Sequence, residues 1–134
     1  MDSAERQRRF EQGLGVLEKL HGHSGLDVIE ALAEVSPELA HQTVAWGYGE
    51  IYSRPQLAAR DRQLVTLGIL TALGGCEPQL EVHINAALNA GLTQGEVIET
   101  LLHTAVYCGF PRALNATLVA GRVFSARAAD ARSA

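Results

Sequence analysis

Residues 73–83 read Leu-Gly-Gly-Cys-Glu-Pro-Gln-Leu-Glu-Val-His. The two glycines end one apolar helix, and the proline begins another, because glycine favours the end of a helix and proline its first turn. His83 lies on this second helix, on a mostly apolar surface. Polar groups in apolar surroundings often have shifted pKa values, so this stretch is the first place to look for chemistry. Cys76 lies seven positions before His83, close to two helical turns. We therefore expect Cys76, Gln79 and His83 to share one side of the helix.

Glycine and proline divide the rest of the chain into further helices. Ser36 before Pro37 predicts a helix start, and Thr93 with Glu96 forms a capping box. Gly22 and Gly25 are expected to break the N-terminal helix. The predicted helices cover residues 3–21, a short stretch around 26–32, and about 36–52, 58–73, 78–90, 93–108 and 111–126, with a frayed tail at 127–134.

The helix predicted over residues 58–73 is apolar almost all round after Gln63. A helix that is apolar on every side is expected to be buried on every side. In a chain this small, such a helix predicts a core position combined with a subunit interface.

Composition points to one all-α domain over residues 1–134. Hydrophobic residues make up 47% of the chain and aromatic residues 5%, with alanine and leucine dominant, which favours helices over strands. The net charge of -4 and the absence of a basic cluster argue against a nucleic-acid partner. The sequence shows neither an apolar run of about 18 residues nor a secretory signal, so we expect no membrane partner. Two cysteines are too few for a disulfide framework, and a cytoplasmic protein is expected.

His83 is the leading candidate for acid–base chemistry. On a helix it falls at the edge of the apolar stripe formed by Leu80, Ile84 and Leu88. A half-buried imidazole that titrates near neutral pH can act as a general acid or base. The alternative is a histidine that only hydrogen-bonds a neighbouring helix.

A second histidine, His103, has Glu99 four residues before it and Tyr107 four residues after it. These side chains lie opposite an apolar stripe, which is typical of a solvated polar face. They become candidates for catalysis only if a second subunit covers that face.

Glu50, Tyr52 and Arg54 form a third cluster, at the end of the helix predicted over residues 36–52. The guanidinium of Arg54 matches a substrate carboxylate in two hydrogen bonds, although a surface arginine is also favoured near a helix end. A carboxylate such as Glu50 near His83 would raise the pKa of that histidine.

We expect no metal site, because the five histidines include no i, i+4 pair.

Four segments together resemble the γ-carboxymuconolactone decarboxylase family, within the wider alkyl hydroperoxidase D-like superfamily. The resemblance covers roughly residues 30–125. It implies an all-α fold with a helical-hairpin core, assembled as a ring-like trimer or hexamer. The segments are residues 49–55, 62–67, 73–80 followed by His83, and 105–111 followed by Asn115.

The resemblance implies decarboxylation of a small carboxylated lactone or a similar unsaturated acid, without a metal or organic cofactor. In this reading Arg54 and Tyr52 bind the substrate, with Cys76 beside them. His83 delivers the proton, and Gln79 or Tyr107 donates to the growing oxyanion. Glu50 and His103 complete the catalytic candidates.

The runner-up is a thiol-dependent peroxidase that uses Cys76. Peroxidases of the superfamily have a CxxC pair followed by histidine, but Gln79 stands at the second cysteine position, and the family's catalytic glutamate falls near Gln63. Cys108 could resolve Cys76 only if their Cα atoms approach within about 7 Å. A third reading is a non-catalytic oligomeric binding protein.

Overall fold

The computed structural model describes residues 1–133, which form six α-helices and one π-helix and contain no strand. The all-α prediction is confirmed. The chain packs as two compact units, the first ending at Ala58 and the second beginning at Ala59. That the whole chain acts as one domain stays a prediction.

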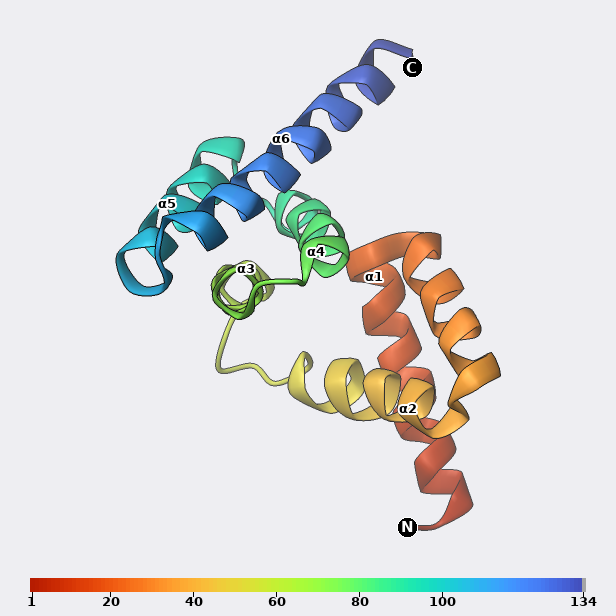
Figure 1. The fold of residues 1–134 in the computed structure, drawn as a ribbon. Helices are drawn as coiled ribbons and strands as arrows, with labels where there is room; N and C mark the ends of the chain where they lie inside the picture. Colours follow the sequence, from red (N-terminus) through yellow and green to blue (C-terminus); the bar gives the residue numbers. More distant parts are fainter. Residues whose placement is uncertain (134) are drawn as a thin grey trace. The chain divides into compact units, whose positions relative to one another are not determined.

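The first unit begins with helix α1 (Ser3–Val35), which is bent at Gly22. Gly22 has φ 63° and ψ -154°, a conformation that side-chain-bearing residues rarely adopt. Figure 1 shows the two halves of α1 meeting at this bend and running back beside each other. The predicted break at Gly22 is confirmed. The break predicted at Gly25 is wrong, because Gly25 lies buried within the second half of α1. The N-cap of α1 is Asp2, whose side chain accepts a hydrogen bond from the backbone N–H of Ala4.

The helix predicted over residues 36–52 begins as expected and then changes type. Ser36 caps α2 (Pro37–Gln42) by accepting a hydrogen bond from the Leu39 backbone N–H at 3.3 Å. The chain continues as the π-helix η1 (Thr43–Ile51). A small core joins α1, α2 and η1 through Leu17, Ile29, Ala40 and Val44.

Two glycines let α1 and η1 approach closely. A Cβ built on Gly13 would collide with the backbone carbonyl oxygen of Val44 and lie 2.7 Å from its carbon. A Cβ on Gly49 would lie 2.7 Å from the Arg9 carbonyl oxygen. The contact between these helices is therefore made by backbone, which only glycine permits at these positions.

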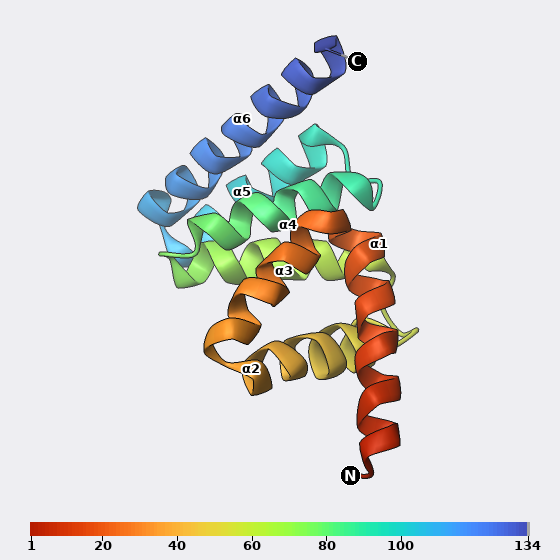
Figure 2. The same ribbon diagram turned by 90° about the vertical axis from the view of Figure 1, so that its right-hand side faces the viewer.

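The second unit consists of α3 (Ala59–Leu73), α4 (Glu77–Asn89), α5 (Gln94–Cys108) and α6 (Phe110–Ser133). Figure 2 shows α3 and α4 lying side by side, with α6 crossing above them. Gly74 and Gly75 make the turn between α3 and α4, with φ angles of 68° and 71°. The core of this unit is apolar and draws on all four helices: Leu67, Leu80, Ile84, Leu92, Val97, Leu101, Val119 and Val123.

Two other predictions for this unit have different outcomes. The capping box is confirmed, since Thr93 and Glu96 exchange two hydrogen bonds of 3.0 Å. The frayed tail is wrong for residues 127–133, which continue α6; residue 134 lies outside the described part. Arg127 explains the continuation, because its guanidinium donates to Asn85 and Asn89 of α4 at 3.0 and 3.1 Å.

Helix α3 is buried on one side in the single chain. Gln63, Leu67 and Thr71 are buried, whereas Val65, Ile69 and Leu73 are exposed. Burial on every side is therefore not a property of one chain, and the predicted subunit interface stays a prediction. None of the helices within residues 1–133 has the length and apolar character needed to cross a bilayer.

Candidate functional site

His83 lies in the middle of α4, at the edge of the face that packs into the core. Leu80, Ile84 and Ala87 bury that face, and they hold the imidazole half-buried beside α3. The Nδ1 atom of His83 lies 3.1 Å from Oε1 of Gln63. The packing of α3 against α4 thus places the imidazole of His83 next to the side-chain amide of Gln63 on the other helix.

Gln63 is completely buried, with 0% of its surface exposed. Its amide oxygen accepts the hydrogen bond from His83, and its Nε2 has no hydrogen-bond partner among the described residues. Because an amide oxygen only accepts, the Nδ1 atom of His83 carries the hydrogen.

Gln63 was not among the site residues predicted from the sequence, although the catalytic glutamate of the superfamily's peroxidases falls near it. The signal for it was its register: Gln63 lies four residues before Leu67, in the stripe of α3 that faces the core. A long polar side chain in such a stripe needs a polar partner. Nothing local in the sequence identifies that partner as His83.

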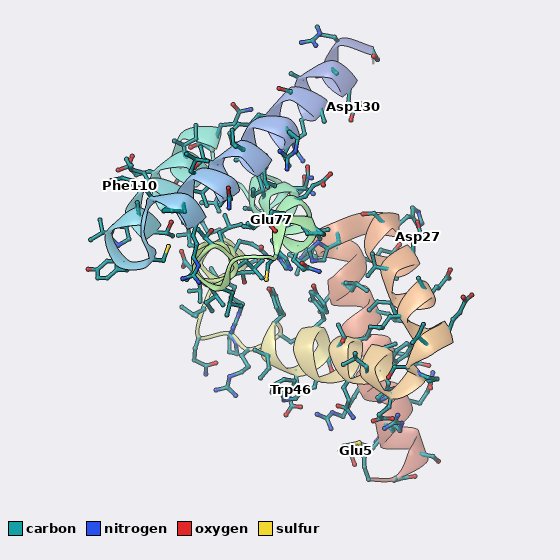
Figure 3. The ribbon with its side chains drawn as sticks, viewed as in Figure 1. Glu5, Asp27, Trp46, Glu77, Phe110 and Asp130 are labelled. Carbon is teal, nitrogen blue, oxygen red and sulfur yellow. The ribbon has the colours of Figure 1, made fainter. Side chains whose placement is uncertain are left out.

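Cys76 and Gln79 lie at the start of α4, the end that the labelled Glu77 marks in Figure 3. Cys76 is the N-cap residue and lies before the first helical turn, with its thiol 3.6 Å from the carbonyl oxygen of Gly74. Gln79 is exposed to solvent. That Cys76, Gln79 and His83 share one face of the helix stays a prediction. The roles of Cys76 and Gln79 stay predictions.

His103, Glu99 and Tyr107 are all exposed on α5, and Tyr107 reaches 82% exposure. The rings of His103 and Tyr107 lie 5.5 Å apart. Glu99 and His103 line an open groove of about 570 Å³ between α3 and α5. These three side chains form the exposed polar face that the sequence predicted.

Glu50, Tyr52 and Arg54 belong to the first unit. The carboxylate of Glu50 forms an ion pair with Arg9 of α1, so its charge is already balanced. Tyr52 stacks on Tyr48 with ring centroids 4.9 Å apart, and Arg54 is exposed just after η1.

A polar pair that the sequence analysis missed lies beside these residues. Nε2 of His21 is 3.0 Å from the hydroxyl oxygen of Tyr48. Burial lowers the pKa of His21 and raises the pKa of Tyr48 well above its usual range. Both groups are therefore neutral near pH 7, which fits a structural hydrogen bond.

Cys76 and Cys108 are both free thiols. Among residues 1–133 no three His, Cys, Asp or Glu side chains are grouped closely enough to hold a metal ion.

Comparison with known proteins gives a family match and several similar relatives. Residues 37–121 match the carboxymuconolactone decarboxylase family. The chain is 34% identical over 119 residues to 4-carboxymuconolactone decarboxylase of Acinetobacter baylyi, covering 88% of both chains. It is 33% identical over 121 residues to nitrosuccinic acid decarboxylase of Metarhizium robertsii, covering 84% of this chain and 79% of that one. An uncharacterized 15.0 kDa protein of Paracoccus denitrificans is 30% identical over 98 residues, covering 72% and 73%.

Proposed function

This chain belongs to the carboxymuconolactone decarboxylase family, and we propose that it releases CO2 from a small carboxylic acid, with His83 as the acid–base group. The observation that carries the proposal is the half-buried imidazole of His83 held by the buried amide of Gln63. An imidazole positioned in this way can act as a general acid or base.

The two decarboxylases similar to this chain suggest which acids suit it. One is named for a carboxylated lactone and the other for a nitro acid. In both compounds, the electron pair of the broken C–C bond can move onto oxygen, either the lactone carbonyl or the nitro group. We propose the same class for this chain: an acid whose carboxylate is conjugated with, or adjacent to, an electron-accepting group that contains oxygen.

The reaction then has two steps. The C–C bond to the carboxylate breaks, CO2 leaves, and the electron pair is held as an enolate-like or nitronate-like oxyanion. Protonated His83 next gives its proton to carbon, and solvent restores that proton. The balance is one proton consumed for each CO2 released, and no oxidant or electron carrier takes part.

The protein must also bind the acid and stabilise the oxyanion. We propose the roles that the sequence suggested: Arg54 as the carboxylate anchor, and Gln79 or Tyr107 as donors to the oxyanion. Such a donor contributes roughly 10²–10³-fold in kcat when it is directed at a developing charge.

A direct assay of CO2 release tests the proposal. We expect the purified chain to decarboxylate 4-carboxymuconolactone or nitrosuccinic acid, or a close analogue in either series, without added metal or cofactor. Each compound incubated without protein is the control. If no acid of either series is turned over while the protein consumes a hydroperoxide in a Cys76-dependent reaction, the peroxidase reading replaces this one.

We also propose that the chain works as a homo-oligomer, a trimer or hexamer. Large apolar side chains remain exposed along α3, α5 and α6, more than a monomer usually leaves in contact with water. Phe110, labelled in Figure 3, is one of those bordering a groove of about 360 Å³ between α5 and α6. The exposed set is Val65, Ile69, Leu73, Ile98, Leu102, Val106, Phe110, Leu114 and Leu118.

A charge placed in the α5–α6 groove should separate the subunits. We expect Leu102→Asp to lower the mass measured by light scattering to that of a monomer, because a buried unpaired carboxylate is costly at an interface. Val28→Asp on α1 is the matched control, since Val28 and Leu102 are both 59% exposed in the single chain. A wild-type protein that is monomeric at micromolar concentration would contradict the proposal.

A further inference from the structure

We infer that Gln63 is a positioning residue that fixes His83 in a single tautomer, with its hydrogen on Nδ1 and its lone pair on Nε2. This inference rests on the proposed role of His83 and adds which of its two ring nitrogens handles the proton. The carrying observation is the contact of 3.1 Å between Nδ1 and the amide oxygen of Gln63.

The geometry of the amide sets the direction of this hydrogen bond. Oε1 of Gln63 has lone pairs and no hydrogen, so Nδ1 must donate. A neutral imidazole has one N–H, and the other nitrogen, Nε2, is then the one that can accept a proton. When Nε2 is protonated, Nδ1 keeps its hydrogen, and the bond to Gln63 persists through the whole cycle.

A neutral amide also suits an imidazole that must release its proton. A carboxylate at position 63 would stabilise the imidazolium and hold the proton more tightly. An amide fixes the ring just as well but adds no negative charge. The pair therefore favours a histidine that gains and loses a proton at Nε2 in each turnover.

Burial of Gln63 argues against a purely structural role. Its Nε2 is a buried donor without a hydrogen-bond partner among the described residues, which costs roughly 1–3 kcal/mol. A residue that served only to fill the core would need no amide, and an apolar side chain of the same size would avoid that cost. The amide is therefore explained by what it does to His83.

The tautomer can be observed by NMR without any substrate. In protein labelled with ¹⁵N at histidine, at a pH well above the ordinary pKa of histidine, we expect His83 to show a protonated Nδ1 and an unprotonated Nε2. The signals are assigned by their loss in His83→Ala. A protonated Nε2 in the wild-type protein would overturn the inference directly.

Variants at position 63 separate positioning from packing. Gln63→Met keeps the side-chain length and removes both polar atoms, so we expect a mixture of tautomers at His83 and an unchanged or higher Tm. Gln63→Glu retains an acceptor, so we expect Nδ1 to stay protonated. This second variant decides the question if Gln63→Met does not fold. Gln79→Met, at an exposed glutamine of α4, is the matched control and should leave the His83 signals unchanged.

Turnover supplies an independent readout. On any acid that the wild-type protein decarboxylates, we expect Gln63→Met to lower kcat about 10- to 100-fold while KM changes little, because a misplaced ring affects the chemical step. A wild-type tautomer retained in Gln63→Met, or a fall in Tm with kcat unchanged, would show that Gln63 only packs. If the wild-type protein decarboxylates nothing, the proposed function fails, and the NMR result still decides the role of Gln63.

Discussion

The His83→Ala variant is expected to lose about 100-fold or more in kcat on the acid that the wild-type protein decarboxylates. This is the usual contribution of a positioned general acid. Without the imidazole, the electron pair left by CO2 must be protonated by water, which is neither oriented nor acidic enough. The measurement is steady-state CO2 release, with size and far-UV circular dichroism confirming that the variant keeps its fold.

His103→Ala is the matched control for that experiment. Both histidines lie on helices of the second unit, but His103 is exposed and its ring lies beside that of Tyr107, whereas His83 is half-buried against Gln63. We expect His103→Ala to keep most of the activity. A fully active His83→Ala protein beside an inactive His103→Ala protein would mean that the proton donor is His103, on a face completed by another subunit.

Gly13→Ala is expected to destabilise the first unit strongly. Its Cβ would collide with the backbone carbonyl of Val44, and a backbone group cannot move aside as a side chain can. Overpacking of this kind costs roughly 1–3 kcal/mol and occasionally more. Trp46, the only tryptophan, lies in η1 and is labelled in Figure 3, so its fluorescence during urea unfolding reports on this contact.

Gly15→Ala is the control for this substitution. Gly15 is two residues further along α1, and a Cβ there would meet nothing within 4 Å. Because alanine is favoured over glycine within a helix, we expect this variant to gain roughly 0.5–1 kcal/mol. Equal stability of the two alanine variants would contradict the close backbone contact between α1 and η1.

Most helix boundaries could be predicted because their signals are local. Ser36 before Pro37, the Thr93–Glu96 capping box and the bend at Gly22 each depend on a few neighbouring residues. The π-helix η1 could not be predicted, since its longer hydrogen-bonded turns have no capping signal of their own. The continuation of α6 was missed because Arg127 is tied to α4, some 40 residues earlier in the chain.

The candidate site shows the same division between local and distant information. His83 could be singled out from its place at the edge of an apolar stripe on one helix. Its partner could not, because Gln63 lies 20 residues away on a different helix, and only the packing register of α3 against α4 brings the two together. The helical spacing of Cys76 and Gln79 suggested nearer partners. Cys76 is the N-cap of α4 and Gln79 is exposed, and their relation to His83 stays a prediction.

Turnover in D₂O, with the product examined by NMR, tests the central claim that His83 delivers the proton. The wild-type protein should give a product with one deuterium on one face of the carbon that is protonated, because the donor is fixed on one side of the bound intermediate. In His83→Ala the residual product should carry deuterium on both faces, since water then supplies it. A His83→Ala protein that forms the same single-faced product at the wild-type rate would contradict the account.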